Sequence, residues 1–483
     1  MATAVTAQAL AALLGDGWRR PGEASSALAD ALRGLVVDGR VAARTRIPSE
    51  RALSMQLGVS RGSVSRAYGR LREDGFLVST RGAGSWLTLP VGSAAPPALP
   101  VPGGASTAQA LDLTIAALPA PDPLLTDAVA GASAALPRHL AGHGYAAAGL
   151  AELREAIAVH LSARGLATSA EEVLVTAGAQ HALHLVLGLL VGPGDRVLVD
   201  APAYPRTLAA IRGARARAVP VSLTATGWDA DAWASAARVA APRLAVTVAD
   251  FHNPTGLTMR AADRAALALT CARAGTVLVS DETCAELRLD GPAMPPPLGA
   301  ADPGGTVVTI GTMSKSAWGG LRIGWIRATA RMVRELAALR ANVDMTSPVL
   351  DQLVAVELLR GWDAVLASRR ALLRPRRDTL LSALAEHAPS WTVRRPHGGI
   401  STWARLPTPD ATRLATAAAR EGIAITPGPA FSVDGTFEHH LRLPFTLPPG
   451  DLRGAIERLA RLATDLSRAD GPTTPEPALA TAV

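Results

Sequence analysis

The sequence predicts an α/β protein with a small helical N-terminal domain and a large domain built on a mostly parallel sheet. Two observations predict this fold: positive charge gathers near the N-terminus, and beyond residue 111 short Val/Leu/Ile runs alternate with apolar helical patterns. Such runs, separated by helices, are typical of a parallel sheet with helices on both faces. The runs are VLVT at 173–176, RVLVD at 196–200, LAVTVA at 244–249, TVLVSD at 276–281 and TVVTIG at 306–311.

Composition divides the chain of 483 residues into four segments. Residues 19–90 hold twelve Arg against six Asp or Glu, a net charge of +6, which is most of the chain's +7. Residues 90–110 are rich in Pro, Ala and Gly and carry no charge, which is typical of an extended linker. We therefore predict a first domain over residues 1–89, a linker over 90–110, a second domain over 111–465 and a disordered tail over 466–483.

The composition also argues against several classes of protein. No apolar run approaches the ~18 residues of a membrane-spanning helix, so no membrane partner is expected. Residues 1–20 lack the basic start, apolar core and cleavage site of a secretory signal. The two cysteines, Cys271 and Cys284, cannot form a disulfide framework, and a cytoplasmic location is the simplest interpretation. No metal site is predicted.

The N-terminal domain has the pattern of a helix-turn-helix followed by a β-hairpin. After a helix over 26–38, Ser49 and Ser60 are natural N-caps of two short helices, and Gly58 lies in the turn between them. Basic and hydroxyl side chains near the start of the second helix could enter a major groove. A solvated basic hairpin is the alternative. Arg61, Ser63 and Arg66 lie on the polar face of the second helix, and Arg81 lies at the tip of the hairpin.

The pattern PSER…LGVSR…VSRAY…L…GF…RGAG, over about residues 26–88, resembles the winged-helix domain of the GntR family of bacterial regulators. The resemblance implies that this domain binds double-stranded operator DNA. The residues expected to face the DNA are Arg51, Ser60, Arg61, Gly62, Ser63, Arg66, Arg81 and, in the wing, Gly82. Ala43 is a departure, because the family usually has Gly in the turn before the PSER helix.

The chain contains 47 arginines and one lysine, Lys315. A guanidinium stays protonated, whereas a lysine amine can lose its proton and form a Schiff base. A leftover surface lysine is the alternative interpretation. Thr312 and Ser314 lie beside Lys315, and Arg322 follows seven residues later. These two hydroxyls and the guanidinium could together hold a phosphate dianion.

Two further motifs follow predicted strands, where loops build sites in open α/β sheets. TAGAQHAL at 176–183 places Gly178, Ala179 and Gln180 at a helix start, where backbone N–H groups could approach a phosphate. Tyr204 in DAPAYPRT could stack on a flat ligand, or it could simply pack between prolines. Because Gly-containing turns are common, the first motif alone is weakly specific.

Two more side chains complete the set. Asn253 in HNPTG could donate a hydrogen bond to a phenolate, and its bond to the following proline is a candidate cis peptide; a simple Pro–Gly turn is the alternative. Asp281, at a strand end, could keep a pyridine nitrogen protonated, or it could cap a helix. A ligand with a phosphate, a pyridinium, a phenolate oxygen and an aldehyde needs these partners, and the single lysine falls where an amine is required.

The set resembles the fold-type-I aminotransferases that use pyridoxal 5′-phosphate (PLP), over about residues 111–465. The resemblance implies a large domain with a mostly parallel sheet and a smaller C-terminal α+β subdomain. It implies that Tyr204 stacks on the PLP ring, Asn253 meets the phenolic oxygen, Asp281 pairs with the ring nitrogen and Lys315 carries the Schiff base. Of these, Lys315, Asp281 and Tyr204 would be the catalytic residues.

The same resemblance assigns three more residues. Tyr145, in YAAAGLAELREAI, would reach the phosphate of the neighbouring subunit, which requires a homodimer. Arg442, in HHLRLPFTLP, would hold a substrate carboxylate; a structural arginine is the alternative. Thr283 stands where many relatives have a tyrosine that hydrogen-bonds the phenolate, a departure that weakens the inference of fast transamination.

A GntR-type winged helix joined by a linker to an aminotransferase-like domain resembles the MocR/GabR regulators over nearly the whole chain. It implies a homodimeric, PLP-dependent transcription factor that senses a small amine, an amino acid or PLP through aldimine chemistry. Two alternatives remain open. The chain could be a working aminotransferase with DNA binding secondary, although the basic N-terminal domain is then unexplained. It could also be a DNA-binding protein on an inert scaffold, against which Lys315 argues.

Overall fold

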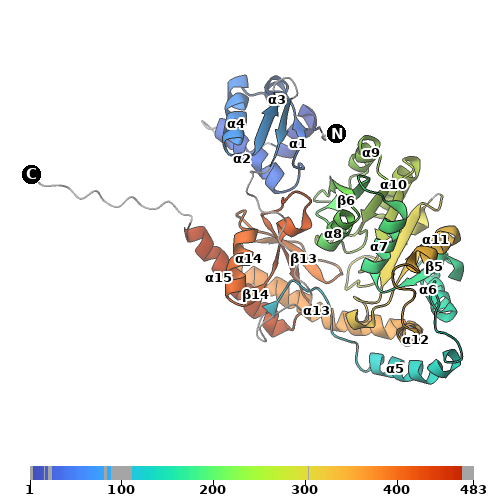
Figure 1. Ribbon diagram of the computed structural model, residues 1–483. Helices are drawn as coiled ribbons and strands as arrows, with labels where there is room; N and C mark the ends of the chain where they lie inside the picture. The colour runs from blue at the N-terminus through green and yellow to red at the C-terminus, as the bar shows by residue number, and fades with distance from the viewer. Residues whose placement is uncertain are drawn as a thin grey trace, which may run out of the picture.

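The computed structural model describes residues 4–15, 17–19, 24–80, 84–88, 111–302 and 304–469. These residues form a small N-terminal unit, a large domain and a small C-terminal domain (Figure 1). The predicted linker and the DNA-facing residues Arg81 and Gly82 lie outside the described residues. The last helix runs to Ala469, so residues 466–469 extend it rather than begin the predicted tail.

The N-terminal unit, residues 4–88, is called the head below. Ser49 Oγ accepts a hydrogen bond from Ala52 N and Ser60 Oγ accepts one from Ser63 N, so both predicted N-caps are confirmed. Gly58 ends the first of these helices in the left-handed conformation. The elements are α1(Ala7–Leu14), α2(Ala24–Val37), β1(Arg46–Ile47), α3(Glu50–Leu57), α4(Arg61–Glu73), β2(Leu77–Thr80) and β3(Gly84–Leu87), with an antiparallel sheet in the order β1-β3-β2.

The large domain is built on a seven-stranded sheet with the order β5-β11-β10-β9-β8-β6-β7. The pairing is parallel except where β11 runs against β5 and β10, so the predicted mostly parallel sheet is confirmed. The strands are β5(Val173–Thr176), β6(Arg196–Ala201), β7(Arg217–Ser222), β8(Leu244–Thr247), β9(Val277–Asp281), β10(Val307–Thr312) and β11(Gly324–Arg327). β5, β8 and β10 are buried along their whole length, as expected for strands covered on both faces.

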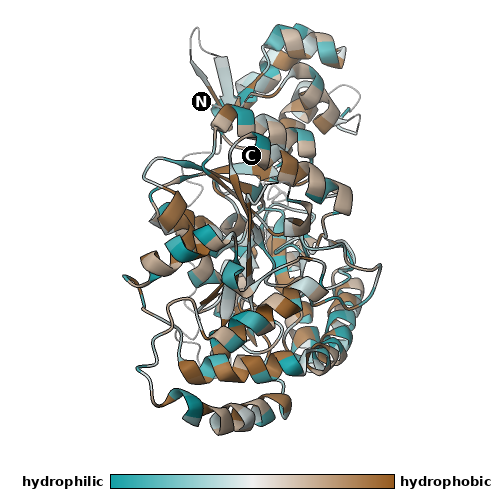
Figure 2. Ribbon diagram, turned by 90° about the vertical axis from the view of Figure 1, so that its right-hand side faces the viewer, coloured by the Kyte–Doolittle hydropathy of each residue, from teal (hydrophilic) through white to brown (hydrophobic). Residues whose placement is uncertain are grey.

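Helices cover both faces of this sheet, and hydrophobic residues gather on the inner strands and helix faces (Figure 2). None of the helices in the described residues is long and apolar enough to cross a membrane. The helices are α5(Leu124–Ala135), α6(Ala151–Ala163), α7(Ala179–Leu190), α8(Pro205–Gly213), α9(Ala230–Ala240), α10(Ala261–Arg273), α11(Ala330–Arg340) and α12(Val349–Arg360). Short 3₁₀ helices are η1(Leu136–His139), η2(Ala170–Glu172), η3(Leu298–Ala301) and η4(Gly319–Leu321).

The small domain packs an antiparallel sheet, in the order β12-β13-β16-β15, against three helices. β4, which lies at the start of the second domain in the sequence, pairs in parallel with β14, so this strand belongs to the small domain. The elements are β4(Leu111–Asp112), α13(Trp362–His387), β12(Thr392–Val393), β13(Ser401–Arg405), α14(Ala411–Arg420), β14(Ile423–Ala424), β15(Thr426–Pro427), η5(Gly428–Phe431), β16(His440–Pro444) and α15(Pro449–Ala469). The predicted α+β subdomain is therefore present.

Candidate functional site

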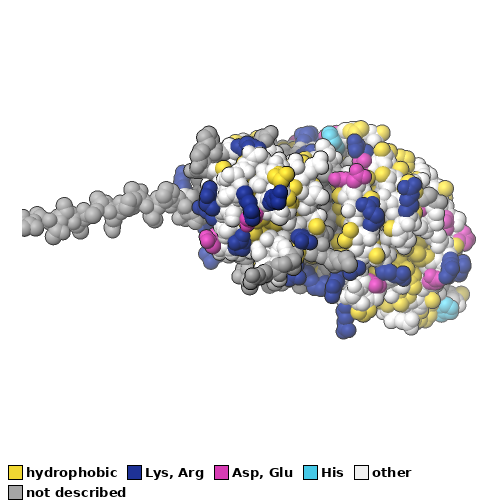
Figure 3. Space-filling model, turned by 90° about the horizontal axis from the view of Figure 1, so that it is seen from above, with side chains coloured by type: hydrophobic (Ala, Val, Ile, Leu, Met, Phe, Trp, Pro, Cys, Tyr) yellow, Lys and Arg dark blue, Asp and Glu magenta, His cyan; other side chains and the backbone are white. Residues whose placement is uncertain are grey.

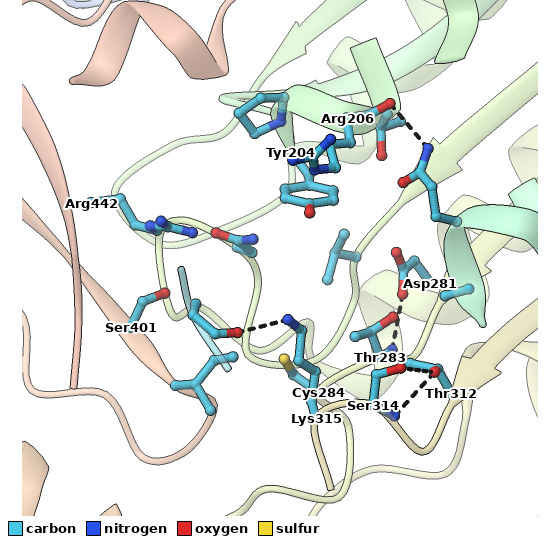
Figure 4. Close-up of a pocket in the computed structure, with 18 of the residues that line it drawn as sticks. Tyr204, Arg206, Asp281, Thr283, Cys284, Thr312, Ser314, Lys315, Ser401 and Arg442 are labelled. Carbon is cyan, nitrogen blue, oxygen red and sulfur yellow. Dashed lines mark hydrogen bonds between the residues drawn. The ribbon is translucent and has the colours of Figure 1, made fainter. Parts of the chain in front are cut away.

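A cavity of about 260 Å³ opens at the carboxyl ends of the parallel strands, where the large domain meets the small domain (Figure 4). One wall comes from β9, β10 and the segments that follow β5 and β6, and the other from β13, β15 and β16. Eleven residues predicted from the sequence line this cavity: Ala179, Gln180, Tyr204, Asn253, Asp281, Thr283, Thr312, Ser314, Lys315, Arg322 and Arg442.

Lys315 follows β10, and its partly buried side chain lines the cavity wall. Its Nζ donates a hydrogen bond to the carbonyl oxygen of Ala116 at 2.6 Å. Burial lowers the pKa of Lys315 below the usual lysine range, and the guanidinium of Arg442 acts in the same direction. Because only the neutral amine is a nucleophile, this environment favours the reactive form.

Asp281 ends β9, and its Oδ1 accepts a hydrogen bond from Thr283 N at 2.9 Å. Burial raises the pKa of Asp281, so this carboxyl holds a proton more readily than an exposed aspartate. Asn253 also lines the cavity, and its Oδ1 is buried with no hydrogen-bond partner in the described part of the chain. Its bond to Pro254 is cis, as the sequence suggested.

Hydrogen-bond donors gather at one end of the cavity, and this group is called the phosphate cradle below. Gly178 is the N-cap of α7 with a φ of +101°, and a Cβ built on it would lie 2.9 Å from Nη2 of Arg322. Arg322 in turn donates to the carbonyl oxygen of Ala177. Thr312 Oγ1 and Ser314 Oγ are 2.9 Å apart. A helix N-terminus, a guanidinium and two hydroxyls form a site suited to a phosphate dianion.

Tyr204 and Arg442 lie on the side of the cavity away from this cradle's hydroxyls (Figure 4). Burial raises the pKa of Tyr204, so its phenol stays protonated at neutral pH. Arg442, on β16, donates to the carbonyl oxygens of Leu113, at 3.3 Å, and Thr114. Burial lowers the pKa of Arg442 to about 10, which still leaves a cation for a carboxylate to meet.

These donors fit PLP. The cradle around Gly178 matches a phosphate, the Asp281 carboxyl matches a ring nitrogen, the Tyr204 ring offers an aromatic face, and the Lys315 amine matches an aldehyde. Tyr145 is different: it is 62% exposed, its ring lies tilted against that of His143 at 5.6 Å, and it does not line this cavity.

The sequence reasoning did not single out several residues of the cavity. Arg206 stands two positions after Tyr204, inside a quoted motif, so its charge could have identified it. Four more are three residues of the small domain and one buried thiol, and no short motif marks them: Ser401, Thr426, Phe431 and Cys284.

The head carries a second candidate surface. Arg51, Arg61 and Arg66 are exposed, as are Ser60 and Gly62, whereas Ser63 is partly buried. Figure 3 shows basic side chains spread over the outer face of the head. Arg61 Nε lies 4.0 Å from Glu50 Oε2. Because an exposed ion pair of this length is weak, the guanidinium can also bind another anion.

Comparisons with known proteins agree with both halves of this description. Residues 24–86 match the family of bacterial regulatory proteins named gntR, and residues 125–459 match the family aminotransferase class I and II. The HTH-type transcriptional regulator TauR of Rhodobacter capsulatus is 33% identical over 463 residues, which are 88% of this chain and 93% of that protein. The probable rhizopine catabolism regulatory protein MocR of Rhizobium meliloti is 29% identical over 403 residues, 78% of this chain and 81% of that one.

A solved structure shows the same fold. LysN, the alpha-aminoadipate aminotransferase of Thermus thermophilus, complexed with N-(5′-phosphopyridoxyl)-L-leucine, superposes with a TM-score of 0.68 at 29% identity. The match covers 74% of this chain and 93% of that one. The resemblances stated from the sequence are thereby confirmed. The chain belongs to the class I and II aminotransferase family and carries a gntR-family domain at its N-terminus.

Proposed function

We propose that this chain is a PLP-dependent, DNA-binding transcriptional regulator whose aminotransferase-like domain senses an amine, an amino acid or PLP itself. One observation carries the proposal: a single chain joins an exposed basic recognition helix to a cavity that holds its only lysine. A working aminotransferase would need the cavity but not the head. The similarity to TauR, which covers 88% of this chain, and the similarity to MocR support the regulatory function.

Each side chain of the cavity would contact a different part of PLP. PLP, when bound, supplies an electrophilic carbon and an electron-withdrawing ring. Lys315 would hold its aldehyde carbon, Asp281 would share a proton with its ring nitrogen, and Asn253 would donate to its phenolic oxygen. Thr312, Ser314 and Arg322, with the start of α7, would bind the phosphate.

Arg442 would hold the carboxylate of an effector that carries one. An effector changes DNA affinity only if it prefers one arrangement of the protein over another. Displacement of Lys315 by an effector amine, together with a new ion pair at Arg442, would provide such a difference.

A DNA-binding titration tests the function. The purified protein, with and without PLP, is titrated into labelled DNA from upstream of its own gene and into a scrambled fragment of equal length. We expect tighter binding to the upstream fragment, weakening steeply as salt rises, and a further change with one of a panel of amines and amino acids. Equal, salt-insensitive binding of both fragments would contradict the proposal.

The proposed regulator is a homodimer. Large apolar side chains are exposed around α5, α12 and the segments that pack against them. A group of exposed apolar side chains is typical of a protein–protein interface. Gly144, beside Tyr145, packs close to Val349 at the start of α12, so these side chains belong to one region. The exposed residues are Val129, Leu140, Tyr145, Val343, Met345 and Leu350. A second copy seated here would bury them and carry Tyr145 to the partner's phosphate cradle.

Mixing two inactive variants tests the role of Tyr145. A Lys315→Arg chain and a Tyr145→Ala chain each lack one part of the PLP site. If Tyr145 acts across the dimer, a mixed dimer has one complete site, whereas a Tyr145 that acts within its own chain leaves none. We expect mixed dimers, formed by co-expression with two different tags, to regain about half of the wild-type visible absorbance with PLP. No regain would overturn the assignment.

A substitution of Gly178 tests the phosphate cradle. Gly178→Ala forces a side chain into a left-handed backbone, at a cost of about 1–3 kcal/mol, and into the guanidinium of Arg322. We expect PLP affinity, measured by absorbance titration, to fall by tenfold or more. Gly275→Ala is the matched control, because Gly275 has a φ of +64° with open space around it. Unchanged affinity in Gly178→Ala would contradict the cradle.

A further inference from the structure

The head rests on the body through the turn that follows α2. Phe437 N donates to the carbonyl oxygen of Val37, and Ala43 N donates to Asp434 Oδ2 at 2.9 Å. Ser222 Oγ donates to the carbonyl oxygen of Gly39 at 2.8 Å. Figure 1 places α2 on the side of the head toward the small domain and α3 on the far side. The contact therefore orients the head, and the basic face at the start of α4 stays exposed.

The loop that receives the head is held in one shape. In residues 432–440, called the docking segment below, Ser432 Oγ lies 2.6 Å from Asp434 Oδ1 and 2.7 Å from Thr436 Oγ1. Phe437 is buried with a φ of +73°, a left-handed backbone that is an outlier for a bulky residue. Such conformations persist only where the surroundings impose them, and they gather at switch regions. The strained residue is the one that bonds to the head.

A column of rings connects this segment to the cavity. The guanidinium carbon of Arg442 lies 5.7 Å from the ring centre of Phe431, which itself lines the cavity. Phe431 meets Trp403 at 5.3 Å, and Trp403 meets Phe437 at 6.2 Å, both edge to face. These spacings are those of directly packed aromatic pairs. Phe431, Trp403 and Phe437, the aromatic column, thus run from the carboxylate-binding arginine to the head.

The end of the column fits the head closely. Gly39 has a φ of +69°, and a Cβ built on it would overlap the ring of Phe437. Asp38, beside it, lies 3.7 Å from both Arg405 and His439 of the small domain. The contact thus combines a close apolar fit, backbone hydrogen bonds and an ionic component. A change of ring position at Phe437 would act directly on the backbone of the head.

We propose that the docking segment is a platform for the DNA-binding head, and that the aromatic column transmits occupation of Arg442 by an effector carboxylate to that platform. The inference rests on the proposed function and adds its route of regulation. In this route a carboxylate competes with the carbonyl groups of Leu113 and Thr114 for the guanidinium, and the rings packed against it shift. The docked and undocked positions of the head are then two states of the protein, and the effector shifts the population from one to the other.

Amide hydrogen exchange measures docking without DNA. The N–H groups of Ala43 and Phe437 both donate across the contact, so undocking exposes them to solvent. In the full-length protein, Gly39→Ala should speed exchange at these two amides by about tenfold, because the added Cβ displaces Phe437. Gly15→Ala is the control: Gly15 has a φ of +60° in the head with nothing nearby, so it should leave both amides unchanged. Equal rates in Gly39→Ala and wild type would overturn the platform.

A second arm tests the connection to the cavity. PLP-loaded wild type is treated with L-alanine, L-glutamate or putrescine, which lacks a carboxylate, and absorbance and exchange are both followed. We expect a carboxylate-bearing probe that shifts the absorbance to change exchange at both amides severalfold, and putrescine to leave exchange unchanged. In Trp403→Leu the absorbance shift should remain and the exchange response should vanish. Trp391→Leu, in the same domain but off the column, should keep both.

The outcomes separate the two proposals. If the absorbance shifts but neither amide responds in the wild type, sensing stands and the coupling fails. The coupling also fails if Trp403→Leu keeps the exchange response. If no probe shifts the absorbance, amine sensing fails and the coupling fails with it, while Gly39→Ala still decides whether the platform holds the head.

Discussion

Lys315→Arg should abolish the visible absorbance that PLP acquires on binding to the wild-type protein. Arginine keeps a cation at the same position, but its guanidinium does not lose a proton and cannot attack an aldehyde. The phosphate cradle is untouched, so PLP should still bind but should leave on gel filtration. Spectra recorded before and after filtration, for wild type and variant, check this expectation.

The composition of the chain allows the attachment point of PLP to be identified directly. Because Lys315 is the only lysine, borohydride reduction of the PLP-loaded wild type should fix PLP on the peptide that contains it. The double variant Lys315→Arg/Arg206→Lys is a matched control that keeps one lysine in the cavity, at the wrong place. It should stay without visible absorbance. Retained absorbance and a reduced adduct in Lys315→Arg would exclude Lys315 as the attachment point.

The lowered pKa of Lys315 sets the direction of the pH dependence. In the folded protein the amine becomes neutral at a lower pH than a free lysine does, because burial disfavours the charged form. The rate of PLP capture should therefore rise with pH through this lowered pKa and level off above it. Stopped-flow absorbance over a pH series would show the midpoint below the ordinary lysine range. A midpoint at or above that range would contradict the burial of this amine in solution.

The sequence was most informative where a local pattern determines both structure and chemistry. β5, β8 and β10 are continuous apolar runs because both of their faces are buried. β7, which contains Pro220, and the short β11 were not among the predicted runs, because neither has the uninterrupted Val/Leu/Ile signal. The motifs after the strands were informative for the same reason: the parallel order gathers their ends at one edge.

Long-range packing accounts for what the sequence did not indicate. Phe431 and Thr426 reach the cavity only because the small sheet pairs β15 and β16 beside it. The contact between head and body depends largely on backbone groups, such as the carbonyl oxygen of Val37 and the N–H of Ala43, which every residue type except proline supplies in full. No residue pattern can indicate such a contact before the tertiary structure is known.

Arg61→Ala/Arg66→Ala should weaken binding to specific DNA by at least ~30-fold. Both side chains are exposed near the start of α4, the helix expected in the major groove. An arginine that reads a base contributes about 1–3 kcal/mol, and one that meets a phosphate also steepens the salt dependence by about one unit of slope. Fluorescence anisotropy over a salt series measures both the affinity and the slope. Little of the loss should come from unfolding, because exposed ion pairs contribute about 0–1 kcal/mol.

The matched control removes the same charge elsewhere. Arg331→Ala/Arg334→Ala also lowers the net charge by two, but on the exposed face of α11 in the large domain. If nonspecific attraction to a basic protein explained the binding, both double variants would lose similar affinity, because long-range attraction depends on total charge. If α4 reads DNA, only the head variant should lose the preference for the upstream fragment. Glu50, at the start of α3, also forms an ion pair with Arg72 at 3.6 Å, so its carboxylate keeps a partner when Arg61 is removed. A loss confined to the head variant would therefore report recognition by α4.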